Sequence, residues 1–389
     1  VEITEWPQEH RKAEGKVVEI LGKIGDVGLE ILSIIKQHDL PLEFPAEVIE
    51  ASKKIPKNVL KDELAGRRDL RHLPIVTIDG EDAKDLDDAV YVQQLSMDEF
   101  LLGVYIADVS YYVKEDSILD KEARERGTSV YLVDRVLPML PERLSNGICS
   151  LNAGVDRLSM ACEMHINREG KVLDYEIFPA VIHVRHRLSY NIVREILAGD
   201  EALRAKYEDI LPMVQLMDEL REILHKKRAR RGAIDFDLPE QKVILDDKLK
   251  PVEIVQRVHG NAESVIEEFM LAANETVAQH MFKQKWPAED KMQELAKLLA
   301  NFNVKFKVQE EIDPAEIQRA VKAMAGRPEE RLVSTVALRS MKQAVYQTEN
   351  IGHFGLAAKF YTHFTSPIRR YPDLIVHRLL REWMHNPEM

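Results

Sequence analysis

An acidic stretch between two β-prone segments constrains the fold of this chain more than any other feature of its sequence. Six acidic residues stand within residues 79–88, namely Asp79, Glu81, Asp82, Asp85, Asp87 and Asp88. Apolar and aromatic residues flank the stretch on both sides, so we expect one strand to end there and another to begin. This frame draws the loop toward a core, where like charges repel one another and lose hydration. A bound divalent cation is the simplest compensation for these charges.

The ligand chemistry narrows the choice of cation. Asp79, Asp85, Asp87 and Asp88 offer only hard carboxylate oxygens, which favour magnesium, with manganese as a second choice, over zinc. A solvated acidic turn at the surface is the competing interpretation. A calcium-binding EF-hand loop is disfavoured, because no start within the stretch gives alternate oxygen ligands, then glycine, then a distant glutamate.

Composition bounds the class of protein. The chain has 389 residues, of which 45% are apolar and 31% charged, enough for one large or two ordinary globular domains. Two cysteines, Cys149 and Cys162, predict buried thiols in a reducing compartment. No apolar run approaches the length of a membrane span, and no basic-then-apolar leader is present. We therefore expect a cytoplasmic protein without membrane association, and a monomer by default.

The charge distribution suggests a polyanionic ligand that enters at one place. The net charge of −12 disfavours nonspecific coating by a polyanion. Local basic clusters fit a polyanion led into a channel, although each cluster alone is better explained as a solvated face. The clusters lie at residues 67–72, 183–187, 226–231 and 369–370.

The coarse pattern predicts three regions. Residues 1–40 contain short strands, too few for an independent β domain. Residues 41–72 form a linker, marked by prolines, with a helix from Ala46 to Lys54. Residues 73–389 form the main domain, with both strands and helices. We predict strands at 101–113, 160–166, 172–184 and 354–360, and helices at 213–231, 262–281 and from 328.

A second informative segment runs from Thr365 to Asp373. Ser366 before Pro367 is a signal for the start of a helix, where free N–H groups and the helix dipole favour an anion. Arg369 and Arg370 in this turn predict a phosphate site, since the arginine fork binds phosphate in a bidentate manner. The alternative is that these arginines bond to carboxylates or loop carbonyls.

Taken together, these segments resemble the ribonuclease II family. The resemblance rests on the aspartates at 79, 85, 87 and 88, on Ile106-Ala107-Asp108-Val109, on Gly127-Thr128-Ser129-Val130-Tyr131, and on the segment from His363 to Tyr371. It covers nearly all of the chain from about Leu73. Residues 1–40 resemble the end of the cold-shock domain that precedes the catalytic domain in this family.

The resemblance implies an α/β fold and an activity. The implied fold is an RNB-type catalytic domain, a mixed sheet flanked by helices around an RNA channel, preceded by the remnant of a β-barrel OB-fold domain. The implied activity is metal-dependent, processive hydrolysis of single-stranded RNA from its 3′ end, which releases nucleoside 5′-monophosphates and leaves a short limit oligonucleotide. The chemistry agrees, because clustered carboxylates can hold two divalent ions and an arginine can stabilise developing charge on the phosphoryl group.

The resemblance also implies roles for individual residues. Asp79, Asp85 and Asp88 resemble metal ligands, and Asp87 resembles the aspartate most critical for the chemical step. Arg369 resembles the arginine that contacts the scissile phosphate. Aromatic and ribose contacts are implied for Tyr131 and Phe236, which would stack on the terminal bases, and for Tyr190 and Glu267, which would select RNA over DNA. For the two stacking aromatics, ordinary core packing is the alternative.

The chain departs from the family pattern in two places. It carries only part of the flanking OB-fold domains, and about ten residues of the family pattern are absent near residues 282–289, through either an omitted segment or a shortened loop. Two rival functions remain, a related phosphodiesterase acting on DNA, and an inactive relative that binds RNA or regulates. Loss of an aspartate or of Arg369 would indicate the inactive relative, and none of them is lost.

Overall fold

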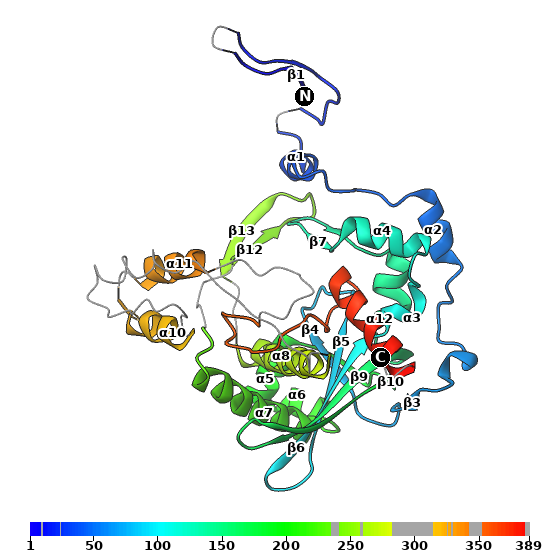
Figure 1. The fold of residues 1–389 in the computed structure, drawn as a ribbon, viewed down its shortest axis with the longest axis vertical. Coiled ribbons are helices and arrows are strands. Elements are labelled where there is room, and N and C mark those ends of the chain that lie inside the picture. The colour runs from blue at the N-terminus through cyan, green and yellow to red at the C-terminus, as the bar shows by residue number, and fades with distance from the viewer. Residues whose placement is uncertain are drawn as a thin grey trace.

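A seven-stranded mixed sheet forms the centre of the fold (Figure 1). The computed structural model describes residues 1–8, 11–23, 25–234, 241–256, 260–281, 314–324, 326–327, 330–341 and 352–385. The outer pairs of the sheet are parallel and the four inner pairs are antiparallel. The strand order is β11 (His186–Ser189), β4 (Val76–Asp79), β5 (Asp88–Gln94), β6 (Glu99–Ala107), β9 (Asp156–Asn167), β10 (Val172–His183) and β3 (Arg68–Asp69).

Both faces of this sheet are buried, as the composition of its strands indicates. In β6, alternate side chains point to opposite faces, so Phe100, Leu102 and Val104 enter one core and Tyr105 and Ala107 enter the other. A strand buried on both faces reads as a nearly continuous apolar run, which is how residues 101–107 read. The predicted α/β class with a mixed sheet is confirmed.

Two helical layers cover the sheet (Figure 1). One layer consists of α5 (Tyr190–Ala198), α6 (Glu201–Lys206), α7 (Leu211–Arg230) and α8 (Asn261–Met281). The other consists of α2 (Ala46–Lys53), α3 (Val109–Tyr112), α4 (Ile118–Arg126) and the π-helical turn η2 (Arg143–Ile148). The last helix, α12 (Tyr371–His385), contributes Leu374 to the second core and Leu380 to the first. The helices predicted at 46–54, 213–231 and 262–281 are confirmed.

Shorter elements lie around this body. The hairpin of β1 (Glu2–Glu5) and β2 (Glu14–Lys16) extends away from the sheet (Figure 1). The other elements outside the sheet are α1 (Leu29–Gln37), the 3₁₀ turn η1 (Lys61–Leu64), the paired strands β7 (Val130–Tyr131) and β8 (Val136–Leu137), the hairpin of β12 (Gln241–Leu245) and β13 (Pro251–Gln256), α10 (Pro314–Ala323) and α11 (Glu330–Ser340).

Several local predictions need correction. Residues 354–360 form no strand but a turn closed by a bridge between His353 and Ala358, because Ala357 takes a positive φ of 49° and the chain reverses. The helix expected near Pro367 begins at Tyr371, after one hydrogen-bonded turn from Ser366 to Arg370. Residues 29–37, expected as strand and turn, form the helix α1. Arg68 and Asp69, expected in the linker, pair with β10 as an edge strand.

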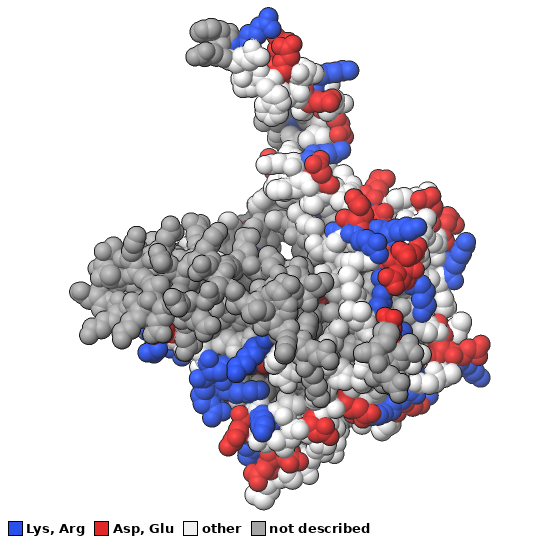
Figure 2. Space-filling model, in the orientation of Figure 1, with Lys and Arg blue, Asp and Glu red and all other residues white. Residues whose placement is uncertain are grey.

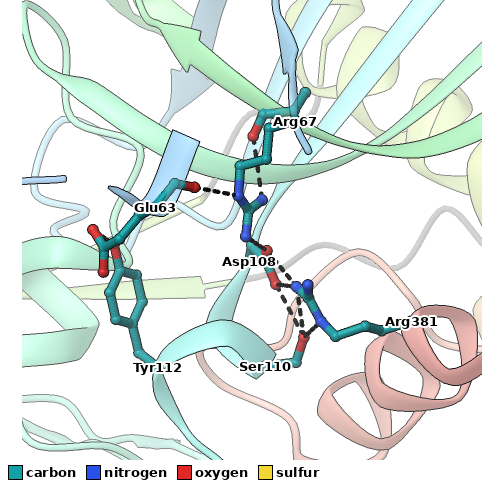
Figure 3. A network of polar contacts seen from close by, with 7 residues as sticks. Glu63, Arg67, Asp108, Ser110, Tyr112 and Arg381 are labelled. Atoms are coloured by element: carbon teal, nitrogen blue, oxygen red, sulfur yellow. Dashed lines mark hydrogen bonds and ion pairs between the residues drawn. The ribbon is translucent and has the colours of Figure 1, made fainter. Parts of the chain in front are cut away.

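A buried ionic network joins three distant parts of the chain (Figure 3). The Asp108 carboxylate, at the end of β6, accepts a 2.7 Å hydrogen bond from Arg67 and bonds from Arg381 of α12 and from the Ser110 hydroxyl. Burial raises the pKa of Asp108, but the two guanidinium groups outweigh it and hold the pKa below its usual range. The network therefore fixes α12 and the segment before the sheet against β6.

The structure bears on the predictions of buried thiols and of no membrane-spanning segment. Cys149 and Cys162 are buried and free, as predicted. In the described part of the chain, every helix is too short or too polar to span a lipid bilayer.

Candidate active site

The acidic loop lies at one edge of the sheet, where the sequence predicts it. Asp79 is the last residue of β4 and Asp88 the first of β5. Between them, the buried Leu86 packs in the core, donates its N–H to the Ser150 hydroxyl at 3.1 Å and accepts from the Leu151 N–H at 2.9 Å. Asp87 and Asp88 are only 2% and 7% exposed. The loop is therefore held against the core, and the competing interpretation as a solvated surface turn is wrong for these two carboxylates.

These carboxylates carry negative charge that the protein does not fully compensate. One oxygen of each of Asp79, Asp87 and Asp88 is buried without a hydrogen-bond partner. Burial, followed by repulsion from Asp88, raises the pKa of Asp79 to about 8. Burial also raises the pKa of Asp88 to about 6 and that of Asp87 well above its usual range, although Arg369 acts in the opposite direction on both. Such a site favours either protons or a bound cation.

The donor set fits a hard divalent cation, although its side chains are not yet gathered around one point. All candidate ligands are carboxylates, the ligands that magnesium and manganese prefer. In the described residues, no three Asp, Glu, His or Cys side chains are arranged so that they could hold a metal ion. Asp85 instead accepts a hydrogen bond from the Tyr131 hydroxyl. Of the carboxylates proposed as ligands, Asp85 thus has one oxygen engaged by Tyr131.

Arg369 reaches the acidic loop from the other end of the sequence. The turn before α12 places the Ile368 N–H 2.8 Å from one oxygen of Asp87. The Arg369 guanidinium then lies 3.4 Å from the other oxygen of Asp87 and donates to the Ser366 hydroxyl at 3.0 Å. The structure thus brings together the two segments that the sequence singles out. The adjacent Arg370 turns instead to the Asp373 carboxylate at 2.7 Å, which is the alternative considered for this pair.

Tyr131 approaches the same loop from a third segment. Its strand β7 follows residues Thr128 and Ser129, whose hydroxyl and N–H respectively donate to the Arg369 carbonyl, each at 2.9 Å. Tyr131 is 51% exposed, so core packing does not explain its position. Its hydroxyl bonds to Asp85. An exposed ring above a cluster of acids is available for stacking on a planar group.

The structure gives less information on the other three predicted RNA contacts, Tyr190, Glu267 and Phe236. Ser189, the last residue of β11, lies opposite Asp79 in parallel register and caps α5, so Tyr190 begins a helix beside the acidic edge. Glu267 lies on α8, half exposed, with an oxygen 3.5 Å from the guanidinium of Arg228 on α7. Phe236 lies outside the described residues, as do residues 282–289, where the sequence departs from the family pattern.

Two residues brace the site although the sequence analysis assigns them no role there. Arg187 of β11 donates to the carbonyls of Glu81 and Ala83 at 2.9 Å and 2.6 Å, so it closes the acidic loop on its outer side. Asp373 is fully buried and accepts from the Ser366 N–H at 2.8 Å, which fixes the turn that carries Arg369. An acid in the first turn of a helix after a Ser-Pro pair is a signal that could have identified Asp373.

Most of the predicted basic clusters are engaged in local ion pairs. Arg71 pairs with Asp156 at 2.8 Å, Arg185 with Asp209 at 2.8 Å and Lys226 with Glu222 at 2.8 Å. Figure 2 shows basic and acidic side chains interspersed over much of the visible described surface. These pairs support the interpretation of the clusters as solvated faces. Arg369 differs because its nearest acid belongs to the acidic loop.

Comparison with known proteins agrees with this geometry. Residues 67–386 match the RNB domain family and residues 1–45 the cold shock domain family. The chain is 48% identical to ribonuclease R 1 of Lactococcus lactis, over 98% of this chain and 48% of that protein. It is also 48% identical to ribonuclease R of Thermotoga maritima, over 98% of this chain and 56% of that protein. This chain therefore spans about half the length of the curated relatives it matches.

A solved ribonuclease structure is also similar to this chain. The structure of Mycoplasma genitalium RNase R in complex with double-stranded RNA has a TM-score of 0.90 to this chain, at 32% identity, over 99% of this chain and 69% of that one. The predicted domain boundaries at residues 40 and 72 stay predictions. The family match covers most of the sequence and includes every described site residue discussed above. The chain therefore belongs to the ribonuclease II family, with an RNB domain at residues 67–386, and is similar to the ribonucleases R within it.

Proposed function

We propose that this chain hydrolyses RNA from the 3′ end in a metal-dependent, processive reaction that releases nucleoside 5′-monophosphates and leaves a short limit oligonucleotide. The observation that carries the proposal is the convergence of three distant segments. Arg369 lies beside the buried Asp87, one oxygen of which has no hydrogen-bond partner, and Tyr131 contacts Asp85 in the same loop. The names of the relatives and the RNA-bound structure of one of them support the choice of RNA as substrate.

Each residue has a proposed role that its position allows. Asp79, Asp85 and Asp88 would hold Mg²⁺, or Mn²⁺, which when bound activates water and stabilises the leaving oxygen. Asp87 would hold a second ion or orient the attacking water. Arg369 would stabilise the charge that develops on the phosphoryl oxygens, since its guanidinium lies beside the acidic loop and its side chain is partly exposed.

The aromatic residues and the predicted ribose contacts have proposed roles in binding the RNA strand. Tyr131, exposed beside the loop, would stack on a base near the cleaved bond, and Phe236 would stack on the other side. Tyr190 and Glu267 would bond to the ribose and so prefer RNA to DNA. The Arg370 guanidinium, although paired with Asp373, would add positive charge near the backbone of the strand. We further propose a cytoplasmic location, which the two free, buried thiols support, and a monomer.

The test is a time course on 5′-labelled single-stranded RNA with Mg²⁺, beside the same reaction with EDTA and a DNA strand of equal sequence. The expected result is a ladder that shortens from the 3′ end to a short limit product, with EDTA abolishing it and DNA resisting it. Intact RNA that is still bound would favour the inactive, RNA-binding relative. Cleaved DNA would favour the rival phosphodiesterase, and internal cleavage would refute a channel entered from the 3′ end.

A matched pair of variants makes the test specific to the acidic loop. Asp87→Asn keeps an oxygen for the Ile368 N–H but removes the buried charge, so cleavage should fall by about 100-fold or more. Asp82→Asn in the same loop removes a charge that is 79% exposed, and should cleave like the parent. Equal rates for Asp87→Asn and the parent would contradict the proposal.

A further inference from the structure

Outside the acidic loop, the buried Asp120 of α4 bonds to the first residue of α12, directly after Arg369 and Arg370. The side chain is fully buried. One oxygen accepts from the Tyr371 hydroxyl at 2.8 Å and from Arg378 at 2.7 Å, and the other accepts from the Asp116 N–H at 2.8 Å. Burial raises the pKa of Asp120, but the bonds from Arg378 and Tyr371 outweigh it and hold the pKa below its usual value. Unlike the acidic loop, this carboxylate is fully satisfied and ionised.

Tyr371 connects this aspartate to the two segments that reach the acidic loop, residues 127–131 with Tyr131 and residues 366–371 with Arg369. These segments are called the two arms below. Tyr371 directly follows Arg369 and Arg370 at the start of α12, and its N–H donates to the Gly127 carbonyl at 2.9 Å. From Gly127 the chain continues to Tyr131. Gly127 has a positive φ of 67°, which lets the chain leave α4 and turn into this arm.

The two arms are bonded to each other along their length. The Ser129 N–H and the Thr128 hydroxyl both donate to the Arg369 carbonyl, and Thr128 and Arg370 form a bridge. These bonds join the arm that carries Tyr131 and the arm that carries Arg369 into one unit. The bonds of Asp120 to Tyr371 and Arg378 fix that unit to α4 and α12.

We propose that Asp120 is a positioning residue which acts through Tyr371 to hold Arg369 and Tyr131 in place over the acidic loop. This inference rests on the proposed function and extends it to a residue outside the acidic loop and the nucleic-acid contacts. Its physical basis is that the site tolerates only small displacements of this turn. The Ile368 N–H and the Arg369 guanidinium lie 2.8 Å and 3.4 Å from the two different oxygens of Asp87. A misplacement of about 1 Å in such a geometry can slow a reaction by about 100-fold.

The test uses substitutions that change the bonds and leave the shape. In Asp120→Asn, one oxygen becomes an amide group that cannot accept, so either the Asp116 N–H or the Tyr371 and Arg378 pair loses its acceptor. Tyr371→Phe removes the hydroxyl, which donates to Asp120 and accepts from Arg124 and Arg378. Asp116→Asn is the matched control, because its side chain is exposed and asparagine tolerates the positive φ of 57° at this position.

The first readout is single-turnover cleavage of single-stranded RNA, with the RNA dissociation constant measured separately. For Asp120→Asn and Tyr371→Phe we expect a rate constant about 10-fold to 100-fold below the parent, with an unchanged folded fraction and RNA affinity within about threefold. A merely structural role would lower the folded fraction of the enzyme, measured by circular dichroism, and leave the rate constant unchanged. That result, or a parent-like rate constant in both variants, would overturn the proposal.

The second readout does not depend on activity. Hydrogen exchange of the amides in residues 127–131 and 366–371 should be faster in Asp120→Asn and Tyr371→Phe than in the parent and in Asp116→Asn. Unchanged exchange in both arms would overturn the proposal even if cleavage slowed. If the parent itself fails to cleave RNA, the proposed function is refuted, and the exchange result alone then decides whether Asp120 holds the two arms.

Discussion

The buried network around Asp108 gives a prediction whose size follows from the structure. Asp108 lies between the guanidinium groups of Arg67 and Arg381, and the side chains of Asp108 and Arg67 are almost wholly buried. Asp108→Asn removes the negative charge and leaves two guanidinium groups close together without it. Breaking a buried ion pair from one side costs about 3–5 kcal/mol. Because Arg381 keeps some contact with water, we expect the lower end of this range.

This loss is large enough to measure by thermal unfolding. The entropy of unfolding is about 2.1 cal/mol/K per residue near 60 °C, so a chain of 389 residues loses roughly 4 °C in Tm for about 3 kcal/mol. The matched control is Asp98→Asn, which alters an exposed acid 4.0 Å from Arg168 and should change the free energy of unfolding by less than about 0.5 kcal/mol.

The pH dependence of this effect distinguishes an ionic network from simple packing. Because the folded-state pKa of Asp108 is below its unfolded value, its contribution is fully present above the unfolded pKa and is lost as the pH falls through the folded pKa. The difference in Tm between the parent and Asp108→Asn should therefore be constant from pH 6 to pH 8. A difference below about 1 °C, or one that changes steadily across this range, would refute the reasoning.

Further predictions concern the acidic loop. Because the pKa values of Asp79 and Asp88 are raised to about 8 and about 6, a cation competes with protons, and calorimetric affinity for Mg²⁺ or Mn²⁺ should rise between pH 6 and pH 8 by roughly tenfold per unit below the higher pKa. Affinity that is flat with pH would contradict this. Without a cation the same raised values should make Tm fall as the pH rises over that range, and adding the cation should reverse the fall. Tyr131→Phe keeps the ring but frees Asp85, so it should retain the limit product on a denaturing gel, whereas Tyr131→Ala should change its length. Equal products from both Tyr131 variants would exclude stacking as the cause.

Local patterns in the sequence predicted the frame of the site. The β-prone flanks placed Asp79 and Asp88 at facing strand ends, and the helical period of residues 213–224 placed α7 against the sheet. The predicted strand at residues 354–360, which the structure replaces with a turn, shows the limit of such patterns. Alternation there was a coincidence of composition, because the positive φ of Ala357 reverses the chain.

The partners of individual side chains could not be read from the same patterns. Arg369 and Arg370 are adjacent and chemically identical, yet one lies at the acidic loop and the other pairs with Asp373. The roles differ because the turn before α12 points successive side chains in different directions. Asp120 looks like an ordinary helix acid in the sequence, and only its burial under Tyr371 reveals its contacts.

The sequence by itself determined the fold class, the position of the acidic loop between two strands and the family. These features depend on propensity, periodicity and short motifs, each of which involves only residues near one another in the chain. Only the tertiary structure decided which groups meet. Asp87 and Ile368 are 281 positions apart, and Tyr131 and Asp85 are 46 apart. Contacts over such separations depend on how the sheet and its helices pack, since burial of apolar surface is non-directional and leaves the pairing of polar groups to the geometry of the packed elements.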